Sequence, residues 1–162
     1  MRFTKNQEVR LKQLLKECEI HGKRILQAKK ACSGFFPLTP TLSQNLNEEQ
    51  VRIVDQLVYR FSKLQDTMGA KLFPLLIELF YEKNPLLTFF DMLNMLEKRT
   101  ILESAEQWIR LREIRNQIAH EYESDADNAT EYLNQVYFES ETLVNIMQQV
   151  TTKIRTNLLP GD

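Results

Sequence analysis

Glycine and proline are scarce in this chain of 162 residues, which has four glycines and five prolines. These two residue types mark most turns and breaks, so the elements between them are expected to be long. No segment alternates apolar and polar residues in the manner of a half-buried β-strand. The sequence therefore favours an all-α protein.

Cysteine is equally rare. Cys18 and Cys32 are the only two, and neither has neighbours at metal-ligand spacing, so no disulfide framework and no zinc site is indicated. No apolar run approaches the roughly 18 residues that span a bilayer. The first residues, MRFTKNQEVRLKQLLKE, lack the apolar stretch of a signal peptide. We expect a cytoplasmic protein with no membrane partner.

Charge is nearly balanced overall but unevenly distributed. The net charge of −1 argues against a protein that coats nucleic acid by bulk electrostatics. Residues 1–34 carry nine Lys or Arg against three acids, whereas residues 121–141 carry seven acids and no Lys or Arg. These two segments predict complementary surfaces, either inside the fold or between subunits. A solvated helix face remains the alternative for any single charge.

Apolar residues recur every three to four positions along most of the chain. This spacing predicts a long amphipathic helix over residues 6–31, with Gly22 as a point of interruption, followed by a loop over residues 32–45. A second long helix is expected to begin at Asn47 and to kink at Pro74, which lacks an amide hydrogen and crowds the carbonyl one turn back.

Three more helices are predicted in the remainder of the chain. They cover residues 86–98, residues 105–121 and residues 128–157, and Ser104 with Gln107 resembles a capping box at the start of the second of these. The whole chain, 1–162, is expected to form a single domain, an up-and-down all-α bundle of about five helices.

The segment RNQIAHEY, residues 115–122, lies at the end of the helix predicted over 105–121. Arg115 and Tyr122 are seven residues apart, so they lie nearly above one another on a helix. His120 is five residues from Arg115, about 140° further round. Because Arg115 and His120 do not share a face, a common substrate would require a distorted helix end or a second chain.

These residue types suit cleavage of RNA, which carries its own nucleophile in the 2′-OH. An imidazole can remove that proton or protonate the leaving oxygen. A guanidinium can hold the phosphate as charge builds on its oxygens, and Asn116 can orient either partner. This chemistry needs no metal ion and no cofactor. The plainer alternative is a histidine favoured by the helix dipole and an arginine covering apolar surface.

RNQIAHEY resembles the signature of the HEPN superfamily: arginine, a polar residue, three variable residues, then histidine. Tyr122 extends it to a pattern that resembles the HepT toxin branch. The context is similar too, since the motif ends a penultimate helix that precedes a long final one. The segment over residues 59–73 also resembles the second helix of HepT-like and nucleotidyltransferase substrate-binding proteins.

The resemblance implies an endoribonuclease toxin of a toxin–antitoxin pair that acts as a homodimer on tRNA or mRNA. It implies that Arg115 and His120 are the catalytic residues, with Asn116 as their polar partner. Tyr122 would be the position that an MNT-type nucleotidyltransferase antitoxin modifies with AMP, which would block phosphate entry beside Arg115. The alternative is a non-catalytic substrate-binding or regulatory partner of a minimal nucleotidyltransferase.

A few residues outside the motif also stand out. Asp66 and Arg112 are possible supporting residues of the site. Gly69, unfavourable in mid-helix, predicts a close helix approach, for which a dimer seam is one place. His21 is interpreted as a surface or packing histidine, and the side chains interpreted as core or interface packing are Trp108, Phe89 and Phe90.

Overall fold

The computed structural model describes residues 3–81, 86–121 and 126–161, except that the side chains of residues 118–121 and 126–128 are not described. Within these ranges all regular secondary structure is helical, which confirms the predicted all-α fold. The elements are α1 (Lys5–Cys32), α2 (Pro40–Gln44), α3 (Glu48–Asp66), the π-helix η1 (Thr67–Leu72), α4 (Phe73–Phe80), α5 (Phe89–Lys98), α6 (Ala105–Glu121) and α7 (Ala126–Leu158).

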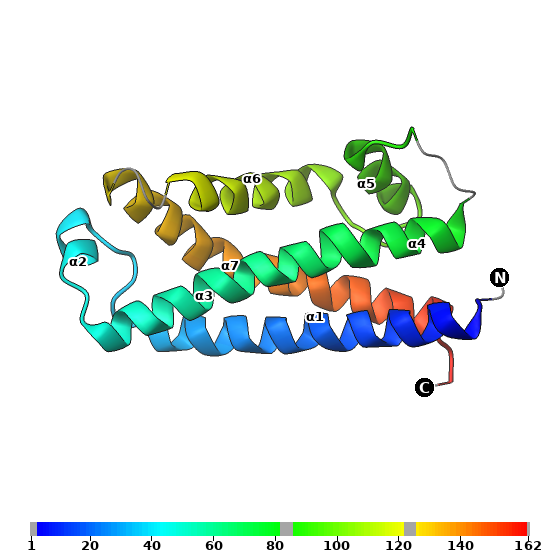
Figure 1. The fold of residues 1–162 in the computed structure, drawn as a ribbon, viewed down its shortest axis with the longest axis horizontal. Coiled ribbons are helices and arrows are strands. Elements are labelled where there is room, and N and C mark those ends of the chain that lie inside the picture. Colours follow the sequence, from blue (N-terminus) through cyan, green and yellow to red (C-terminus); the bar gives the residue numbers. More distant parts are fainter. Residues whose placement is uncertain (1–2, 82–85, 122–125, 162) are drawn as a thin grey trace.

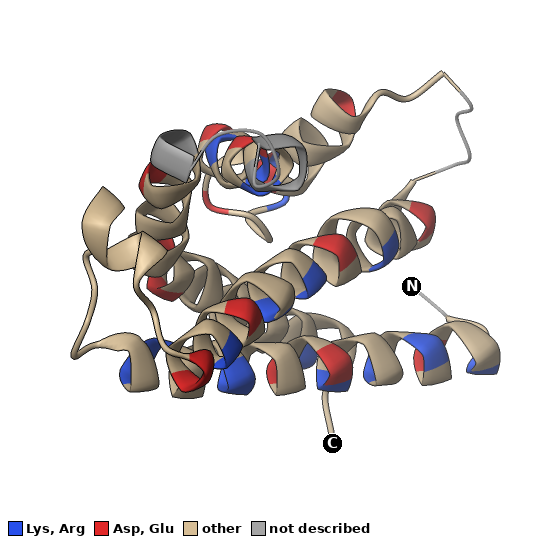
Figure 2. Ribbon diagram, turned by 60° about the vertical axis from the view of Figure 1, so that its left-hand side comes forward, with Lys and Arg blue, Asp and Glu red and all other residues tan. Residues whose placement is uncertain are grey.

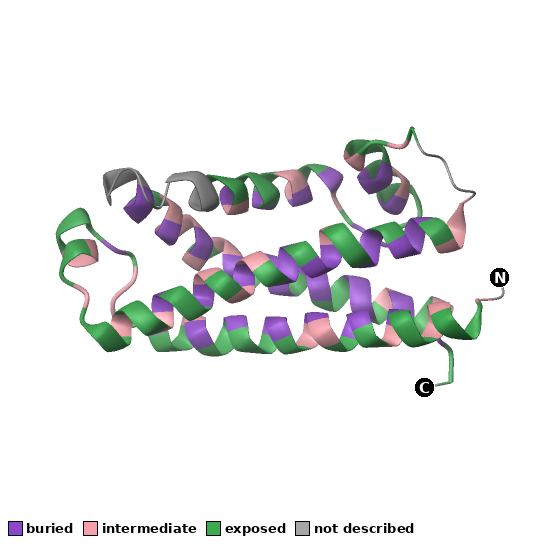
Figure 3. Cartoon of the chain, viewed as in Figure 1, coloured by how far each residue is buried: buried purple, intermediate pink, exposed green. Residues whose placement is uncertain are grey.

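The long helices run up and down beside one another (Figure 1). α1 packs against both α3 and α7, and α6 packs against α7. η1 and α4 continue α3 as one rod, and α5 lies between the end of that rod and α6. In Figure 3 the buried residues of α1, α3 and α7 lie where these helices face one another. The predicted helical bundle is therefore confirmed.

α1 continues through Gly22, contrary to the interruption expected there. Thr4 caps this helix, and its side chain and that of Gln7 form a reciprocal capping box. Gly22 is buried against Met147 of α7, whose terminal methyl group would collide with a Cβ at this position. The missing side chain thus serves close packing of α7 on α1 rather than a bend.

The segment after α1 is more ordered than the predicted loop. Thr39 and Pro40 start the short helix α2, with the Thr39 side chain accepting a hydrogen bond from Leu42 N. The side-chain amide of Asn134 on α7 accepts from Leu38 N at 2.7 Å and donates to Leu38 O at 2.8 Å. These two bonds fasten the connection to the start of α7.

Pro74 disrupts the rod formed by α3, η1 and α4, but the disruption takes the form of a π-helical turn. Thr67–Leu72 forms η1, and Phe73 N donates to Met68 O, five residues back. A normal α-helical turn would place the Pro74 ring against the carbonyl one turn earlier. The wider turn inserts an additional residue, so α3 and α4 present different faces to the bundle.

Large aromatic side chains fill the core beside this turn. Trp108 of α6 is 1% exposed, which confirms its predicted packing role. Its indole meets Phe73 edge-on, with ring centroids 4.8 Å apart. Phe61, Leu64, Met68 and Leu72 are also fully buried. This cluster joins α6 to the α3–η1–α4 rod, and it fixes which face of α6 points toward that rod.

The basic N-terminal segment and the acidic segment meet inside the fold. Lys29 Nζ of α1 lies 3.3 Å from Glu141 Oε2 of α7, and it also lies 5.0 Å from the centroid of the Tyr137 ring. Elsewhere, both acidic and basic residues occur along α1 and α3 (Figure 2). At least part of the predicted charge complementarity therefore operates between helices of one chain.

His21 is 7% exposed, so it is a packing histidine. Arg60 Nη1 lies 3.0 Å from His21 Nδ1, and an arginine can only donate, so the neutral ring carries its proton on Nε2. Burial and the positive charge of Arg60 lower the pKa of His21, with a smaller effect from Lys63, while Glu17 opposes the shift.

We predict that the free energy of unfolding falls as the pH drops below about 6.5, the ordinary pKa of histidine. The unfolded chain then binds a proton that the folded chain resists, so acid favours unfolding until the lowered pKa of His21 is also passed. Denaturant titrations at pH 7.5 and 5.5 would measure the difference. His21→Gln should reduce this pH dependence, and an unchanged slope in that variant would contradict the assignment.

Candidate functional site

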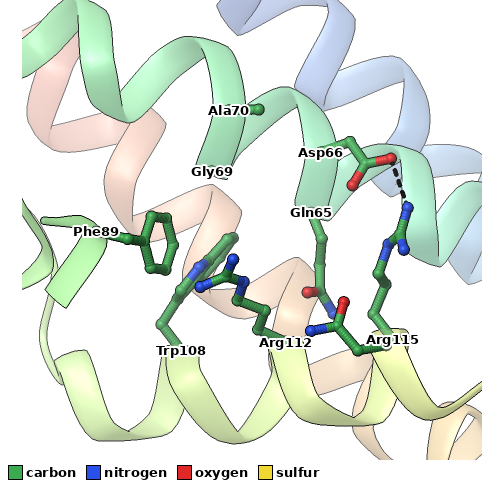
Figure 4. Close-up of a pocket in the computed structure, with 9 residues that line it drawn as sticks. Gln65, Asp66, Gly69, Ala70, Phe89, Trp108, Arg112 and Arg115 are labelled. Atoms are coloured by element: carbon green, nitrogen blue, oxygen red, sulfur yellow. Dashed lines mark hydrogen bonds and ion pairs between the residues drawn. The ribbon is translucent and has the colours of Figure 1, made fainter.

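A pocket of about 320 Å³ lies between α6 and the junction of α3 with η1 (Figure 4). The residues that line it come from four elements: Gln65, Asp66, Gly69, Ala70, Phe89, Trp108, Arg112, Arg115 and Asn116. Its size is at the lower end of the range for small-molecule sites. Two guanidinium groups, two amides, a carboxylate and two aromatic rings thus meet in one cavity.

One face of α6 supplies four of these residues. Trp108, Arg112 and Asn116 are spaced by four residues, and Arg115 is adjacent to the same row. The start of α6 is fixed by two side-chain acceptors. Ser104 Oγ accepts from Gln107 N at 3.1 Å, and Glu97 Oε2 of α5 accepts from Ala105 N at 2.6 Å. The helix is therefore anchored before it reaches the pocket.

Arg115 is held by Asp66 across the pocket. Arg115 Nη2 donates to Asp66 Oδ2 at 3.1 Å, and the two side chains are 30% and 48% exposed. A pair this exposed contributes about 0–1 kcal/mol to stability. Arg115 Nε is buried and makes no hydrogen bond within the described part of the chain. The guanidinium is thus oriented by one carboxylate contact, with donors left for a further acceptor.

Arg112 covers an aromatic ring in the same pocket. Its guanidinium carbon lies 4.1 Å from the centroid of Phe89, the first residue of α5. Phe89 is partly buried against the core, whereas its neighbour Phe90 is 55% exposed. An arginine stacked on a ring in this way gains a cation–π interaction and keeps its edge donors available.

Gln65 connects the two sides of the pocket. It is 4% exposed, and its Nε2 donates to the carbonyl oxygen of Leu111 at 2.8 Å. This bond fixes the register of α3 against α6 at the point where Arg115 meets Asp66. It also fixes the orientation of the amide, so that Gln65 Oε1 is left as an acceptor at the pocket wall.

Gly69 lies opposite Trp108, so the close approach predicted for it takes place inside one chain. A Cβ at this position would lie 3.5 Å from Trp108 Cζ2 and 3.9 Å from Phe89 Cε2. Those are ordinary contact distances, and a longer side chain would cover both rings. The glycine therefore leaves the partly buried Phe89 ring accessible from the pocket, whereas Trp108 is buried beneath it.

The structure brings together Arg112, Arg115, Asn116 and Asp66, the four predicted site residues whose side chains it describes. α6 runs through His120 to Glu121, but the side chain of His120 is outside the described residues, and so is Tyr122 altogether. Among the described residues, no group of three or more His, Cys, Asp or Glu is placed to hold a metal ion. No helix of this part of the chain is long and apolar enough to cross a membrane.

Comparisons of the chain with protein-family models, with curated proteins and with solved structures gave no match. The resemblance to HEPN proteins therefore stays a prediction that depends on the motif and its helical context.

Sequence reasoning missed Gln65 and Ala70, and it assigned Phe89 and Trp108 to packing alone. Gln65 carried a usable signal, because it is a polar residue beside Asp66 in a mostly apolar stretch of helix. Ala70 carried no such signal, because its position at the pocket wall depends on the π-helical turn.

We predict that Gln65→Ala lowers the free energy of unfolding by about 1–3 kcal/mol, because it deletes a buried hydrogen bond and leaves a cavity. Gln56→Ala is the matched control, since Gln56 is exposed on the same helix. Denaturant unfolding of both variants would test this, and equal losses would contradict the anchoring role of Gln65.

Proposed function

We propose that this protein is a metal-independent endoribonuclease that acts as a homodimer, the toxin of a HEPN–MNT toxin–antitoxin pair. Arg115 and His120 are the proposed catalytic residues, and Asn116 is their polar partner. The proposed substrate is tRNA or mRNA in the cytoplasm.

One observation carries this proposal: Arg115 and Asn116 of the motif both line the pocket, where Arg115 is oriented by Asp66 and retains unused donors. A guanidinium in this state is suited to a phosphate, which offers several acceptor oxygens in a geometry that the fork of an arginine matches. His120 follows Asn116 by one helical turn, about 6 Å along the axis.

The proposed reaction is an internal transfer at one phosphodiester. The 2′-oxygen loses its proton and bonds to phosphorus, and the bond from phosphorus to the 5′-oxygen breaks as that oxygen takes up a proton. His120 would carry out the proton transfers. Arg115 would stabilise the charge that builds on the phosphate oxygens. The products are a 2′,3′-cyclic phosphate and a 5′-hydroxyl, and no water or metal ion is consumed.

A second chain is part of this proposal because of helix geometry. His120 lies about 140° round α6 from Arg115. Two copies of α6 facing each other would supply an arginine from one protomer and a histidine from its partner to the same strand.

We expect the purified protein to cleave RNA in the presence of EDTA. Arg115→Ala and His120→Ala should each lower the rate by about a hundredfold or more. Arg110→Ala is the matched control, because Arg110 lies on the same helix but pairs with Glu139 of α7, at 3.3 Å. Gel analysis with detection of cyclic phosphate ends would measure the effect. Folded wild-type protein that leaves many RNAs intact would overturn the proposal and favour the non-catalytic partner of a nucleotidyltransferase.

We further expect an MNT-type nucleotidyltransferase with ATP to attach AMP to Tyr122 and to suppress the cleavage. The bulky anionic group would lie near Arg115 and repel the phosphate of the substrate. Mass spectrometry of the treated protein would locate the modification. Tyr122→Phe should abolish it, whereas Tyr59→Phe, at a 54% exposed tyrosine of α3, should not. Modification of both variants to the same extent would contradict the assignment.

A further inference from the structure

The inner end of the pocket, away from the Asp66–Arg115 pair, is formed by flat and apolar groups. Phe89 and Trp108 form its wall, and the guanidinium of Arg112 lies over Phe89 at 4.1 Å from the ring centroid. Guanidinium planes and aromatic rings are the surfaces on which proteins stack nucleobases. A base placed against Arg112 would extend the stack that Phe89 begins.

Gly69 keeps this end of the pocket open. Glycine within a helix costs about 1 kcal/mol relative to alanine. Any long side chain here would lie over Phe89 and Trp108. The glycine therefore leaves the partly buried Phe89 ring uncovered, whereas Trp108 behind it is 1% exposed. Figure 4 shows Gly69 on the rod opposite these two rings. The position is thus occupied by a residue small enough to keep this end of the pocket open.

A hydrogen-bond acceptor, Gln65 Oε1, lies at the pocket wall between the aromatic side chains and Arg115. Gln65 is 4% exposed, and its Nε2 is committed to the Leu111 carbonyl. Its Oε1 accepts no hydrogen bond within the described part of the chain. An amide oxygen that faces the pocket without a protein donor can accept a hydrogen bond from a ligand that brings an N–H group. Cytosine, adenine and guanine carry an exocyclic amino group. Uracil carries a carbonyl oxygen where cytosine has its amino group and donates only through N3–H in the ring, so an oxygen placed to meet the exocyclic group would face a second acceptor.

We propose that this pocket binds one nucleotide of a single-stranded RNA next to the cleaved bond, and that it prefers a base with an exocyclic amino group. The base stacks on Arg112, which Phe89 supports from the other side, and donates to Gln65 Oε1, while its phosphate meets Arg115 and Asn116. The inference rests on the proposed function for placing this nucleotide within an RNA strand. Binding of a nucleotide in the pocket does not require that the protein cleaves RNA.

The test uses 5′-CMP and 5′-UMP, which have similar shapes but differ in the amino group. Trp108 is the only tryptophan of the chain, so its fluorescence reports on the pocket directly. Titration calorimetry on the full-length protein would give the affinities. We expect CMP to bind roughly tenfold more tightly than UMP, the effect of leaving the amide oxygen unpaired. If CMP does not bind, the proposed nucleotide site is wrong. If CMP and UMP bind with equal affinity, the proposed hydrogen bond from the base to Gln65 Oε1 is wrong.

Two pairs of variants locate the binding. Phe89→Ala should weaken CMP binding roughly tenfold, whereas Phe90→Ala, at the exposed neighbouring ring, should leave it unchanged. Gly69→Leu should fill the pocket and remove binding, whereas Gly69→Ala should retain most of it because a Cβ fits at contact distance. Circular dichroism and thermal unfolding would verify that each variant folds. Equal effects within either pair would contradict the proposal.

Free mononucleotides contain no phosphodiester, so these results do not depend on the ribonuclease activity. Selective CMP binding by a protein that cleaves no RNA would support the pocket and reject the proposed function. RNA cleavage by a protein that binds neither mononucleotide, with Phe89→Ala cleaving as fast as the wild type, would support the function and reject the pocket.

Discussion

The π-helical turn in front of Pro74 is the feature on which the geometry of the site depends. Pro74 has no amide hydrogen and its ring crowds the carbonyl one turn back, and just before it Phe73 N donates to Met68 O, five residues back. The resulting π-helical turn rotates α4 relative to α3 and buries Phe73 against Trp108. Gly69 and Ala70 are left beside α6, and they form the wall of the pocket. π-helical turns of this kind often lie at functional sites.

The alignment of α3 with α6 and the rotation of α6 about its axis determine which side chains line the pocket. The hydrogen bond from Gln65 to the Leu111 carbonyl aligns α3 with α6. The core around Trp108 then sets the rotation of α6, so that Arg112 and Asn116 point into the cavity with Arg115 at its edge. A shift of α6 by one residue would turn the motif away from the rod by about 100°. The chemistry of the site therefore depends on packing that lies outside the motif.

The sequence was sufficient to predict most helices, because caps and apolar spacing are local signals. The helix start expected at Asn47 is confirmed, and there Asn47 and Gln50 form a capping box. The structure also starts α6 at Ala105, as expected. Thr39-Pro40 was a cap signal for α2 that the loop prediction overlooked. The π-helical turn could not be predicted from the sequence, because Pro74 implies that the helix is disrupted without specifying the form of the disruption. In the site, Arg115 and Asn116 came from the motif and Arg112 from the same helix, whereas Gln65 and Ala70 depend on how two distant segments align.

The contact between Arg115 and Asp66 has a consequence for ligand affinity. A free arginine side chain loses about 1.5–2 kcal/mol of rotamer entropy when it is immobilised. Asp66 already restricts Arg115 in the folded protein, so much of that entropy is lost on folding and not on ligand binding. Because the pair is partly exposed, exchanging the carboxylate for a phosphate costs little. Asp66 thus preorganises the arginine, and it keeps that side chain available to an anionic ligand.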